Sequence, residues 1–253
     1  MNQLRSKKYF DDRATREMSE NLHFKQRTLQ EDLAYACRIL AMTDQEAGLA
    51  GQITARSDRP NCYWTLRFGL GFDEATPEDF IEVDRDLKTV SGTGMANPAT
   101  RFHLWVYDAR PDRNAIIHTH SPWVSALVSA HQPLVVSQMD MTPFHNDCAF
   151  LADWPGVPIA DQEGAIISEA LGNKRSILLA HHGQLTAGDC VEEAAYLSVY
   201  LERAARMQVR ARVFGEIKPL RPDLAQEAHD YLLQPSIVKG TFDYWCRQVD
   251  GTR

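Results

Sequence analysis

The segment 115–123 constrains the fold most, because it joins an apolar strand to the start of a helix. Ala115, Ile116 and Ile117 predict a buried strand. Residues two apart in a strand point from the same face, so His118 and His120 can face one common object. Ser121 as N-cap and Pro122 at the first helical position predict a helix directly afterwards. Two imidazoles at such a strand end are typical of a metal site, although packed or surface histidines explain the pair equally well.

A second apolar segment also ends in histidine. Residues 176–180 predict another short strand, and His181 and His182 follow it before Gly183. Either histidine can supply a third nitrogen, and the spacing does not choose between them. Three neutral imidazoles around a divalent cation leave at least one position open, which is typical of a catalytic metal. Such a cation can polarise a carbonyl or hydroxyl oxygen. The two strand ends together therefore favour a catalytic metal site.

Strand-like and helix-like segments alternate along the chain. Predicted helices cover residues 29–41, 102–109, 122–130, 162–171 and 191–212, and predicted strands cover 52–56, 63–68, 79–84, 115–119, 134–136 and 176–180. Predicted helix caps are Thr28 with Glu31, Thr100, Asp189 with Glu192, and Gly172. Residues 137–160 predict a long irregular loop of the kind that often carries function. This alternation predicts an α/β architecture with helices packed on a sheet.

The ends of the chain differ from this alternating middle. Residues 1–27 are polar and charged, and we expect a mobile arm or a short amphipathic helix there. Residues 28–215 form the predicted domain. Residues 216–253 are too rich in aromatic side chains for a solvated tail, so we expect them to pack on the domain or on a neighbouring subunit. Tyr231 and Tyr244 are the tail residues that can complete a neighbour's site, a point that the sequence leaves open.

Composition excludes several classes of protein. The 253 residues carry a formal net charge of -7, which argues against nucleic-acid binding. No apolar run approaches the roughly 18 residues that a membrane span needs. The basic segment 1–8 lacks a following apolar core, so no secretory signal is expected. The five cysteines never occur as CxxC, which favours reduced thiols in a cytoplasmic protein.

Two further histidines have weaker claims to function. His103 is placed on the polar side of its predicted helix, where an ordinary packed or surface histidine is the better interpretation. His145 lies in the long loop near Asp140 and Asp147. A general acid or base is conceivable there, and an ordinary loop histidine is at least as good an interpretation.

Several motifs taken together resemble the class II aldolase/adducin family. They are Gly51-Gln52-Ile53-Thr54-Ala55-Arg56, Ala109-Arg110-Pro111-Asp112, His118-Thr119-His120-Ser121-Pro122, Leu178-Leu179-Ala180-His181-His182-Gly183 and Val191-Glu192-Glu193-Ala194. They occur in the family's order between about residues 29 and 212. The resemblance implies a three-layer αβα sandwich with a central mixed, mainly antiparallel sheet. It also implies His118, His120 and His182 as metal ligands, and a homotetramer with its site at subunit contacts.

The chain departs from the sugar-phosphate aldolases of this family at two places. Ala99 stands where they carry a catalytic glutamate, and Asn97 and Pro98 stand near the position of two phosphate-binding serines. Asn97-Pro98-Ala99, Ser137-Gln138 and Phe144-His145 look more like the adducin-like branch. That branch includes metal-dependent decarboxylases of aromatic or hydroxy acids and a few iron-dependent oxygenases. Adducin itself is a structural protein that has lost the ligand histidines, whereas this chain keeps all three.

These observations lead to a functional expectation. We expect a metal-dependent carbon–carbon lyase of the aldolase or decarboxylase type, acting on a small, non-phosphorylated hydroxy or oxo acid or an aldehyde-yielding substrate. One divalent metal per subunit is expected, zinc first, with iron, manganese, cobalt or nickel as alternatives. Gln52, Asn97 and Gln138 are expected to contact the substrate, and His145 is the candidate to replace the missing glutamate. The alternatives are a mononuclear non-haem iron oxygenase and a non-catalytic adducin-like interaction module.

Overall fold

A single eight-stranded sheet forms the centre of the protein, in a computed structural model that describes residues 4–251. Its strands are β1 (Gln52–Arg56), β2 (Tyr63–Leu66), β3 (Phe80–Val83), β4 (Thr89–Ser91), β5 (Ala115–Thr119), β6 (Cys148–Leu151), β7 (Ser176–Leu179) and β8 (Gly183–Gly188). They lie in the order β4-β3-β2-β1-β5-β8-β7-β6. Only the β6–β7 pair is parallel among these strands. The predicted mixed, mainly antiparallel sheet is confirmed.

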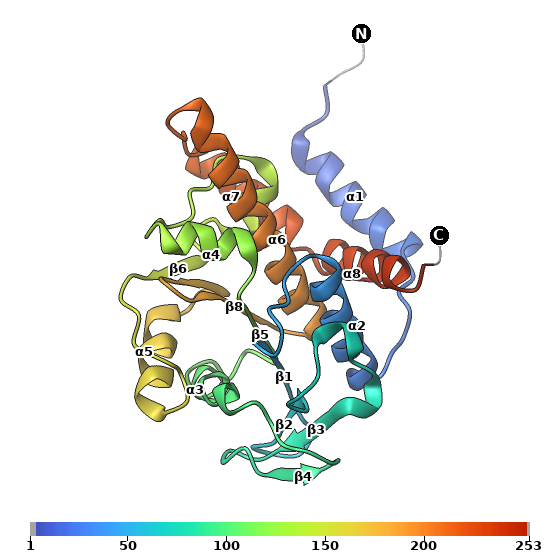
Figure 1. Ribbon diagram of the computed structural model, residues 1–253. Coiled ribbons are helices and arrows are strands. Elements are labelled where there is room, and N and C mark those ends of the chain that lie inside the picture. The colour runs from blue at the N-terminus through green and yellow to red at the C-terminus, as the bar shows by residue number, and fades with distance from the viewer. Residues whose placement is uncertain (1–3, 252–253) are drawn as a thin grey trace.

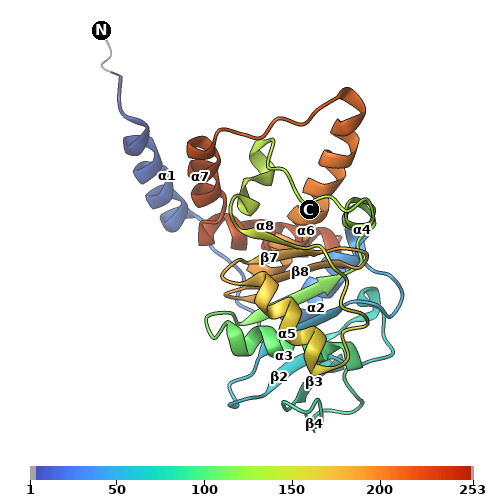
Figure 2. The same cartoon turned by 90° about the vertical axis from the view of Figure 1, so that its left-hand side faces the viewer.

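Helices cover both faces of this sheet (Figures 1 and 2). The α-helices of the described residues are α1 (Lys7–Asn21), α2 (Leu29–Met42), α3 (Arg101–Ala109), α4 (Pro122–Ser129), α5 (Asp161–Leu171), α6 (Val191–Ala211), α7 (Pro222–Leu232) and α8 (Pro235–Val249), of which α1 lies away from the sheet. Successive strand residues point to opposite faces. Accordingly, Ile117 packs with the buried side chains of α2, α6 and α8, whereas Ile116 packs with those of α3 and α5. The result is the expected three-layer αβα sandwich.

The capping box predicted at the start of α2 is present. The Thr28 hydroxyl accepts a hydrogen bond from the Glu31 backbone N–H at 3.2 Å, and the Glu31 carboxylate accepts one from the Thr28 N–H at 2.6 Å. These bonds satisfy two of the backbone donors that a helix start leaves without partners. The remaining turns of α2 bury an apolar stripe against the sheet.

Thr100 occupies the predicted N-cap position of α3 without making a capping bond, and the predicted cap Asp189 is wrong, because Cys190 occupies that position. Thr100 makes no capping hydrogen bond and is fully buried, whereas the Asn97 side chain accepts the Ala99 N–H at 3.0 Å in the preceding 3-10 turn Pro98–Thr100. Asp189 does not cap α6, because its carboxylate pairs with Arg113. The Asp189 side chain binds a partner distant in sequence, and Thr100 ends a short 3-10 turn. Neither side chain therefore makes the capping bond that local spacing predicted.

The strand predictions also need correction. Residues 134–136 are not a strand, because the Val135 N–H donates to the Gln208 side chain of α6 at 2.7 Å instead of to a neighbouring strand. The predicted loop 137–160 contains the 3-10 helix Met139–Phe144 and strand β6. Strand β8 was not predicted, since its glycine-bounded sequence has weak strand propensity. It forms because β5 and β7 hydrogen-bond to it on both sides.

Helices lie near both ends of the described residues. Helix α1 buries none of its residues and projects from the body (Figure 1). Helix α8 inserts Phe242 and Cys246 into the core beside α2 and α6 of the same chain. Tyr231 is half-buried and Tyr244 is 49% exposed. The limits of the predicted arm, domain and tail stay predictions, and residues 1–3 and 252–253 lie outside the described residues.

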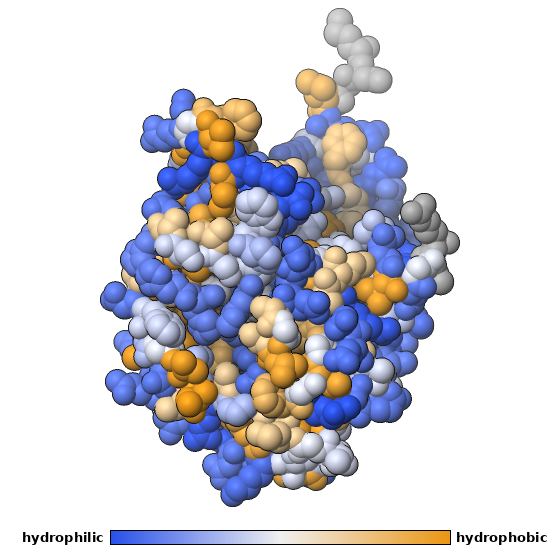
Figure 3. Space-filling model, viewed as in Figure 1, coloured by the Kyte–Doolittle hydropathy of each residue, from blue (hydrophilic) through white to orange (hydrophobic). Residues whose placement is uncertain are grey.

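Several surface features bear on the environment of the protein. Across residues 4–251, no helix combines the length and the apolar character needed to cross a membrane. All five cysteines are unpaired. Val213 and Phe214, just after α6, are 84% and 92% exposed. Hydrophobic side chains gather at that upper left tip in Figure 3.

Candidate metal centre

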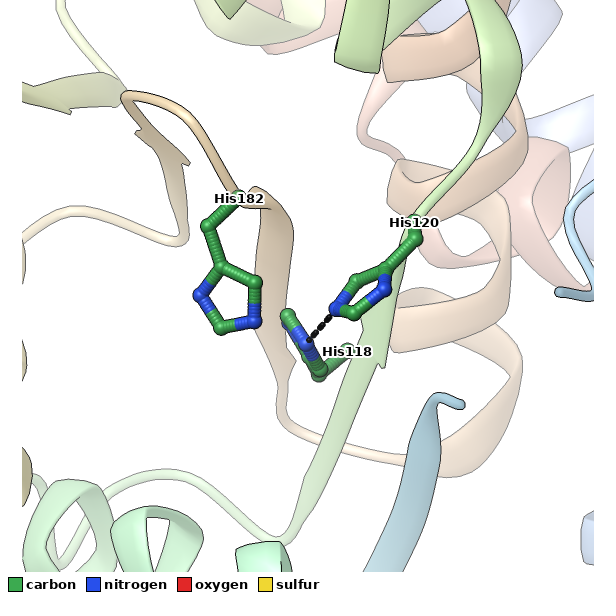
Figure 4. A group of neighbouring side chains, drawn as sticks. All are labelled: His118, His120 and His182. Carbon is green, nitrogen blue, oxygen red and sulfur yellow. Dashed lines mark hydrogen bonds between the residues drawn. The ribbon is translucent and has the colours of Figure 1, made fainter. Parts of the chain in front are cut away.

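Three histidines from two adjacent strands converge at one point (Figure 4). His118 lies in β5 and His120 directly follows that strand, while His182 lies in the tight turn between β7 and β8. Because β5 and β8 are antiparallel, with His118 opposite Leu185, the end of one strand meets the beginning of the other. The turn also distinguishes the two candidates for the third nitrogen. His181 is exposed and its ring lies near His131 instead of the other two histidines.

The spacing of the three rings suits a single metal ion. The Nε2 atoms of His118 and His120 are 2.9 Å apart, and one nitrogen from each of the three rings lies within 4.8 Å of the others. Nitrogens held about 2.0–2.1 Å from one zinc ion in tetrahedral geometry are roughly 3.3 Å apart. The three nitrogens therefore already lie at about the spacing that one ion requires.

The three imidazoles are held in the neutral form that a metal requires. Burial lowers the pKa of His118 well below its ordinary value, and the neighbouring rings of His182 and His120 lower it further. Burial also lowers the pKa of His120, and it lowers that of His182 to about 4. A neutral imidazole keeps one nitrogen lone pair available for a cation.

A backbone carbonyl orients the most buried of the three rings. His118 Nδ1 lies 2.7 Å from the carbonyl oxygen of Gln184, so Nδ1–H donates this hydrogen bond. The donation places the proton on Nδ1 and leaves the lone pair on Nε2, the atom that faces His120. The ring of Phe102 packs edge-to-face against His118 and covers it from the side of α3. The ring therefore has one tautomer and little rotational freedom.

Gly183 permits the close approach of the two strand ends. A Cβ atom on this residue would lie 2.4 Å from the Thr119 carbonyl oxygen and 3.0 Å from Cδ2 of His120. Cβ atoms essentially never approach heavy atoms closer than 3.0 Å. The residue after His182 must therefore lack a side chain if His120 and His182 are to face each other.

The helix that follows His120 is capped from outside. The Glu202 carboxylate of α6 accepts hydrogen bonds from the backbone N–H groups of Trp123 and Val124, both at 2.9 Å. Ser121 occupies the predicted N-cap position and Pro122 begins the helix, but the Ser121 side chain makes no capping bond. Glu202 is buried, and this burial raises the pKa of its carboxyl group. A negative charge at this position also interacts favourably with the helix dipole of α4.

Of the residues predicted to bind substrate, Gln52 lies beside His118, and Asn97 lines a small cavity next to Gln52. Gln52 pairs with His118 across β1 and β5, so both side chains point from the same face of the sheet. The Gln52 side chain is buried and its Oε1 atom has no hydrogen-bond partner. Asn97 donates to the Leu49 carbonyl at 3.3 Å and lines the same small cavity as Gln52. Ala99 is half-buried two residues further on.

The other two predicted site residues are not brought to the histidines within one chain. Gln138 caps the 3-10 helix Met139–Phe144 and contacts Met207 Sδ at 3.1 Å. His145 contacts Asn146 and precedes β6, whereas His182 follows the opposite end of the parallel strand β7. A four-residue strand at about 3.3 Å per residue separates these two ends. Within one chain His145 is therefore remote from the three histidines, and its role as a replacement for the glutamate stays a prediction.

Three residues of the site were not predicted from the sequence, and one histidine lies elsewhere than predicted. The side chain of Glu202 and the carbonyl of Gln184 act across long sequence distances, so no local pattern pointed to them. Gly183 had a signal, because it directly follows His182 in the motif. His103 is fully buried instead of lying on a polar helix face, and its Nδ1 lies 2.9 Å from the Thr54 hydroxyl. Burial lowers the pKa of His103 to about 3, as expected for a packed histidine.

The chain is similar in sequence to two Streptomyces proteins and in structure to an aldolase. The chain is 32% identical over 186 residues to the 4-hydroxy-3-prenylphenylpyruvate oxygenase/4-hydroxy-3-prenylbenzoate synthase of Streptomyces roseochromogenus subsp. oscitans, covering 72% of this chain and 67% of that protein. It is equally identical over 186 residues to decarboxylase NovR of Streptomyces niveus, covering 72% and 68%. The structure of L-fuculose 1-phosphate aldolase from Glaciozyma antarctica PI12 superposes with a TM-score of 0.81 and 26% identity, covering 92% and 97%.

Class II aldolases use a divalent metal, and a histidine triad is present here. Residues 31–209, which contain the whole triad, match the family described as Class II Aldolase and Adducin N-terminal domain. The sheet, its helical layers and the motifs quoted above agree with that match. The chain therefore belongs to the class II aldolase and adducin N-terminal domain family.

Proposed function

We propose that this protein is a metal-dependent carbon–carbon lyase whose single divalent cation is held by His118, His120 and His182. The convergence of three neutral imidazoles carries this proposal. Within residues 4–251 no other group of three or more His, Cys, Asp or Glu residues is close enough to hold one ion. Such a purely nitrogen set suits zinc, and iron, manganese, cobalt and nickel are the alternatives. A bound cation supplies positive charge next to the substrate oxygen on which negative charge develops.

Decarboxylation is the cleavage that this site supports best. Aldol cleavage needs a base that takes the proton of a hydroxyl group, and Ala99 stands where the resemblance places that base. A carboxylate is already ionised at neutral pH, so it loses CO2 without a base. The carbon–carbon bond breaks, the electron pair stays on the remaining fragment, and a proton from water replaces CO2. The similarity to a protein named a decarboxylase supports the same choice.

The substrate is a small hydroxy or oxo acid without a phosphate group. Gln52 offers a buried amide with an unpaired Oε1 beside His118, and Asn97 faces the same cavity. Among the described residues that line this cavity the basic side chain is Arg67, and it is already paired with Asp79 at 3.0 Å. A phosphate dianion would lack a free cation there. Gln52 and Asn97 therefore suit the neutral or singly charged oxygens of an acid.

Elemental analysis of two alanine variants tests the metal site. His182→Ala removes a candidate ligand, and we expect its divalent metal content to fall to a small fraction of the wild-type value. His181→Ala is the matched control, since it changes the adjacent histidine, which is exposed and turned away. Its metal content should equal that of the wild type. Wild-type protein without divalent metal, or equal losses in both variants, would refute the proposed site.

A mononuclear iron oxygenase is the second candidate function. The observation that favours it is the similarity to a protein named an oxygenase. Three histidines with open positions can also hold Fe(II), although the common site of such oxygenases contains a carboxylate. Product formation from aromatic hydroxy and oxo acids should be compared with and without oxygen. A lyase turns over under nitrogen, whereas an oxygenase stops and consumes oxygen only in air.

We also propose that the protein works as a homo-oligomer, a tetramer by family resemblance, in the cytoplasm. The exposed tip of Val213 and Phe214 supports a contact with a second copy, and the unpaired cysteines support a reducing compartment. Phe214→Ser should lower the mass measured by light scattering. The exposed Leu224→Ser, on α7, serves as the control. A monomeric wild type would contradict the proposal.

A further inference from the structure

Helix α6 carries two buried polar side chains on the face of the sheet opposite to the His118 ring. Ser198 and Glu202 are one helical turn apart, so they lie on the same side of α6. Both are buried, at 0% and 6% exposure. The His118 side chain points to the opposite face of the sheet, toward Phe102 of α3. These α6 side chains can therefore act on the histidines only through the strands and helices that carry them.

Ser198 is connected to His118 through Gln184. The Gln184 Nε2 atom lies 3.0 Å from the Ser198 hydroxyl and 2.9 Å from the hydroxyl of Thr119, the residue between His118 and His120. Gln45 completes this buried network, because its Oε1 accepts from Ser198 and from Gln184 at 2.9 Å. The backbone of Gln184 in turn accepts the His118 Nδ1–H. The side-chain network thus anchors the carbonyl that orients the His118 ring.

Glu202 is connected to His120 through the start of α4. Its two carboxylate oxygens each accept one backbone N–H, from Trp123 and from Val124. Only Ser121 and Pro122 separate His120 from these residues, and Pro122 has a restricted backbone. The position of the α4 start therefore determines where the chain leaves β5, and with it the direction of the His120 side chain.

We propose that Ser198 and Glu202 are positioning residues that hold His118 and His120 in the relative arrangement required for metal binding. This inference rests on the proposed metal site. Buried hydrogen bonds to fixed backbone groups restrict motion strongly, since breaking one leaves a buried polar group without a partner. Groups that orient metal-binding histidines typically change metal affinity about 10- to 100-fold when removed. Removing either side chain therefore weakens metal binding although neither touches the metal.

Cobalt binding by the intact protein tests this proposal. Glu202→Gln replaces one accepting oxygen by an NH2 group, and Ser198→Ala removes the hydroxyl while keeping a good helix-forming residue. Gln208→Leu is the matched control, because Gln208 is also buried on α6 and bonds to the backbone of Val135 and Pro133, away from the histidines. The dissociation constant for Co2+ is measured by chelator competition, together with the visible Co2+ spectrum and the Tm of the metal-free protein.

We expect the Kd for Co2+ to rise about 10- to 100-fold in Glu202→Gln and Ser198→Ala, with an altered spectrum. Gln208→Leu should lower the Tm and leave Kd and spectrum unchanged. Wild-type Kd values in both test variants, or an equal rise of Kd in the control, would overturn the positioning role. If Glu202→Gln does not fold, the Kd of Ser198→Ala for Co2+ is the deciding measurement. A wild type that binds no Co2+ would instead overturn the metal site itself, and the positioning role with it.

Discussion

Gly183→Ala provides a sharp test of how the two strand ends form the histidine centre. The new Cβ would lie 2.4 Å from the Thr119 carbonyl oxygen, about 1 Å short of the 3.4 Å at which ordinary contact begins. It would also lie 3.0 Å from the His120 ring. The first obstacle is backbone, so β5 and β8 must move apart by about this amount. Overpacking of this kind costs about 1–3 kcal/mol of unfolding free energy.

The same shift affects the candidate metal site directly. Moving β8 away from β5 lengthens the bond from His118 to the Gln184 carbonyl and separates His182 from His120. We therefore expect metal affinity to fall about 10- to 100-fold, as for loss of an orienting group.

Urea unfolding of the metal-free protein and chelator competition measure the two effects of Gly183→Ala. Gly240→Ala is the control, since its Cβ would meet only Phe24, at an ordinary 3.5 Å, and alanine is favoured inside helix α8. The control should be neutral or stabilised by up to about 1 kcal/mol. If Gly183→Ala keeps the stability and the metal affinity of the wild type, close strand approach does not shape this site.

Two further predictions concern stability. Burial lowers the pKa of His103 to about 3. The unfolded chain therefore binds a proton first as the pH falls below the ordinary value of 6.5, and the unfolding free energy should decrease from there toward pH 3. His103→Asn cannot take up that proton, so urea unfolding across this range should show a shallower decrease, and an unchanged slope would contradict the assignment. Thr28→Ala removes the capping box of α2 and should cost about 1 kcal/mol in urea unfolding at pH 7, whereas a change near zero would show that the cap contributes nothing.

Local sequence patterns predicted the elements that are stabilised by residues close together in the sequence. The Thr28 and Glu31 pair predicted the start of α2 because both partners of each hydrogen bond lie within one turn. The apolar run before His118 predicted β5 because a strand buried on both faces needs apolar residues throughout. Patterns of this kind failed at β8, where hydrogen bonds from β5 and β7 outweigh a sequence with weak strand propensity.

The sequence by itself determined that histidines stand at the ends of two strands, and family motifs indicated which three to choose. Only the tertiary structure decided that His182 turns inward and His181 outward, and that within one chain His145 and His182 lie at opposite ends of the β6–β7 pair. The tertiary structure alone showed that the Gln184 carbonyl accepts a hydrogen bond from His118, and that Glu202 accepts one from the start of α4, which follows His120. The physical reason is the range of the interactions involved. Helix caps and strand alternation depend on residues a few positions apart, whereas the convergence of the histidines depends on pairing between strands more than sixty residues apart.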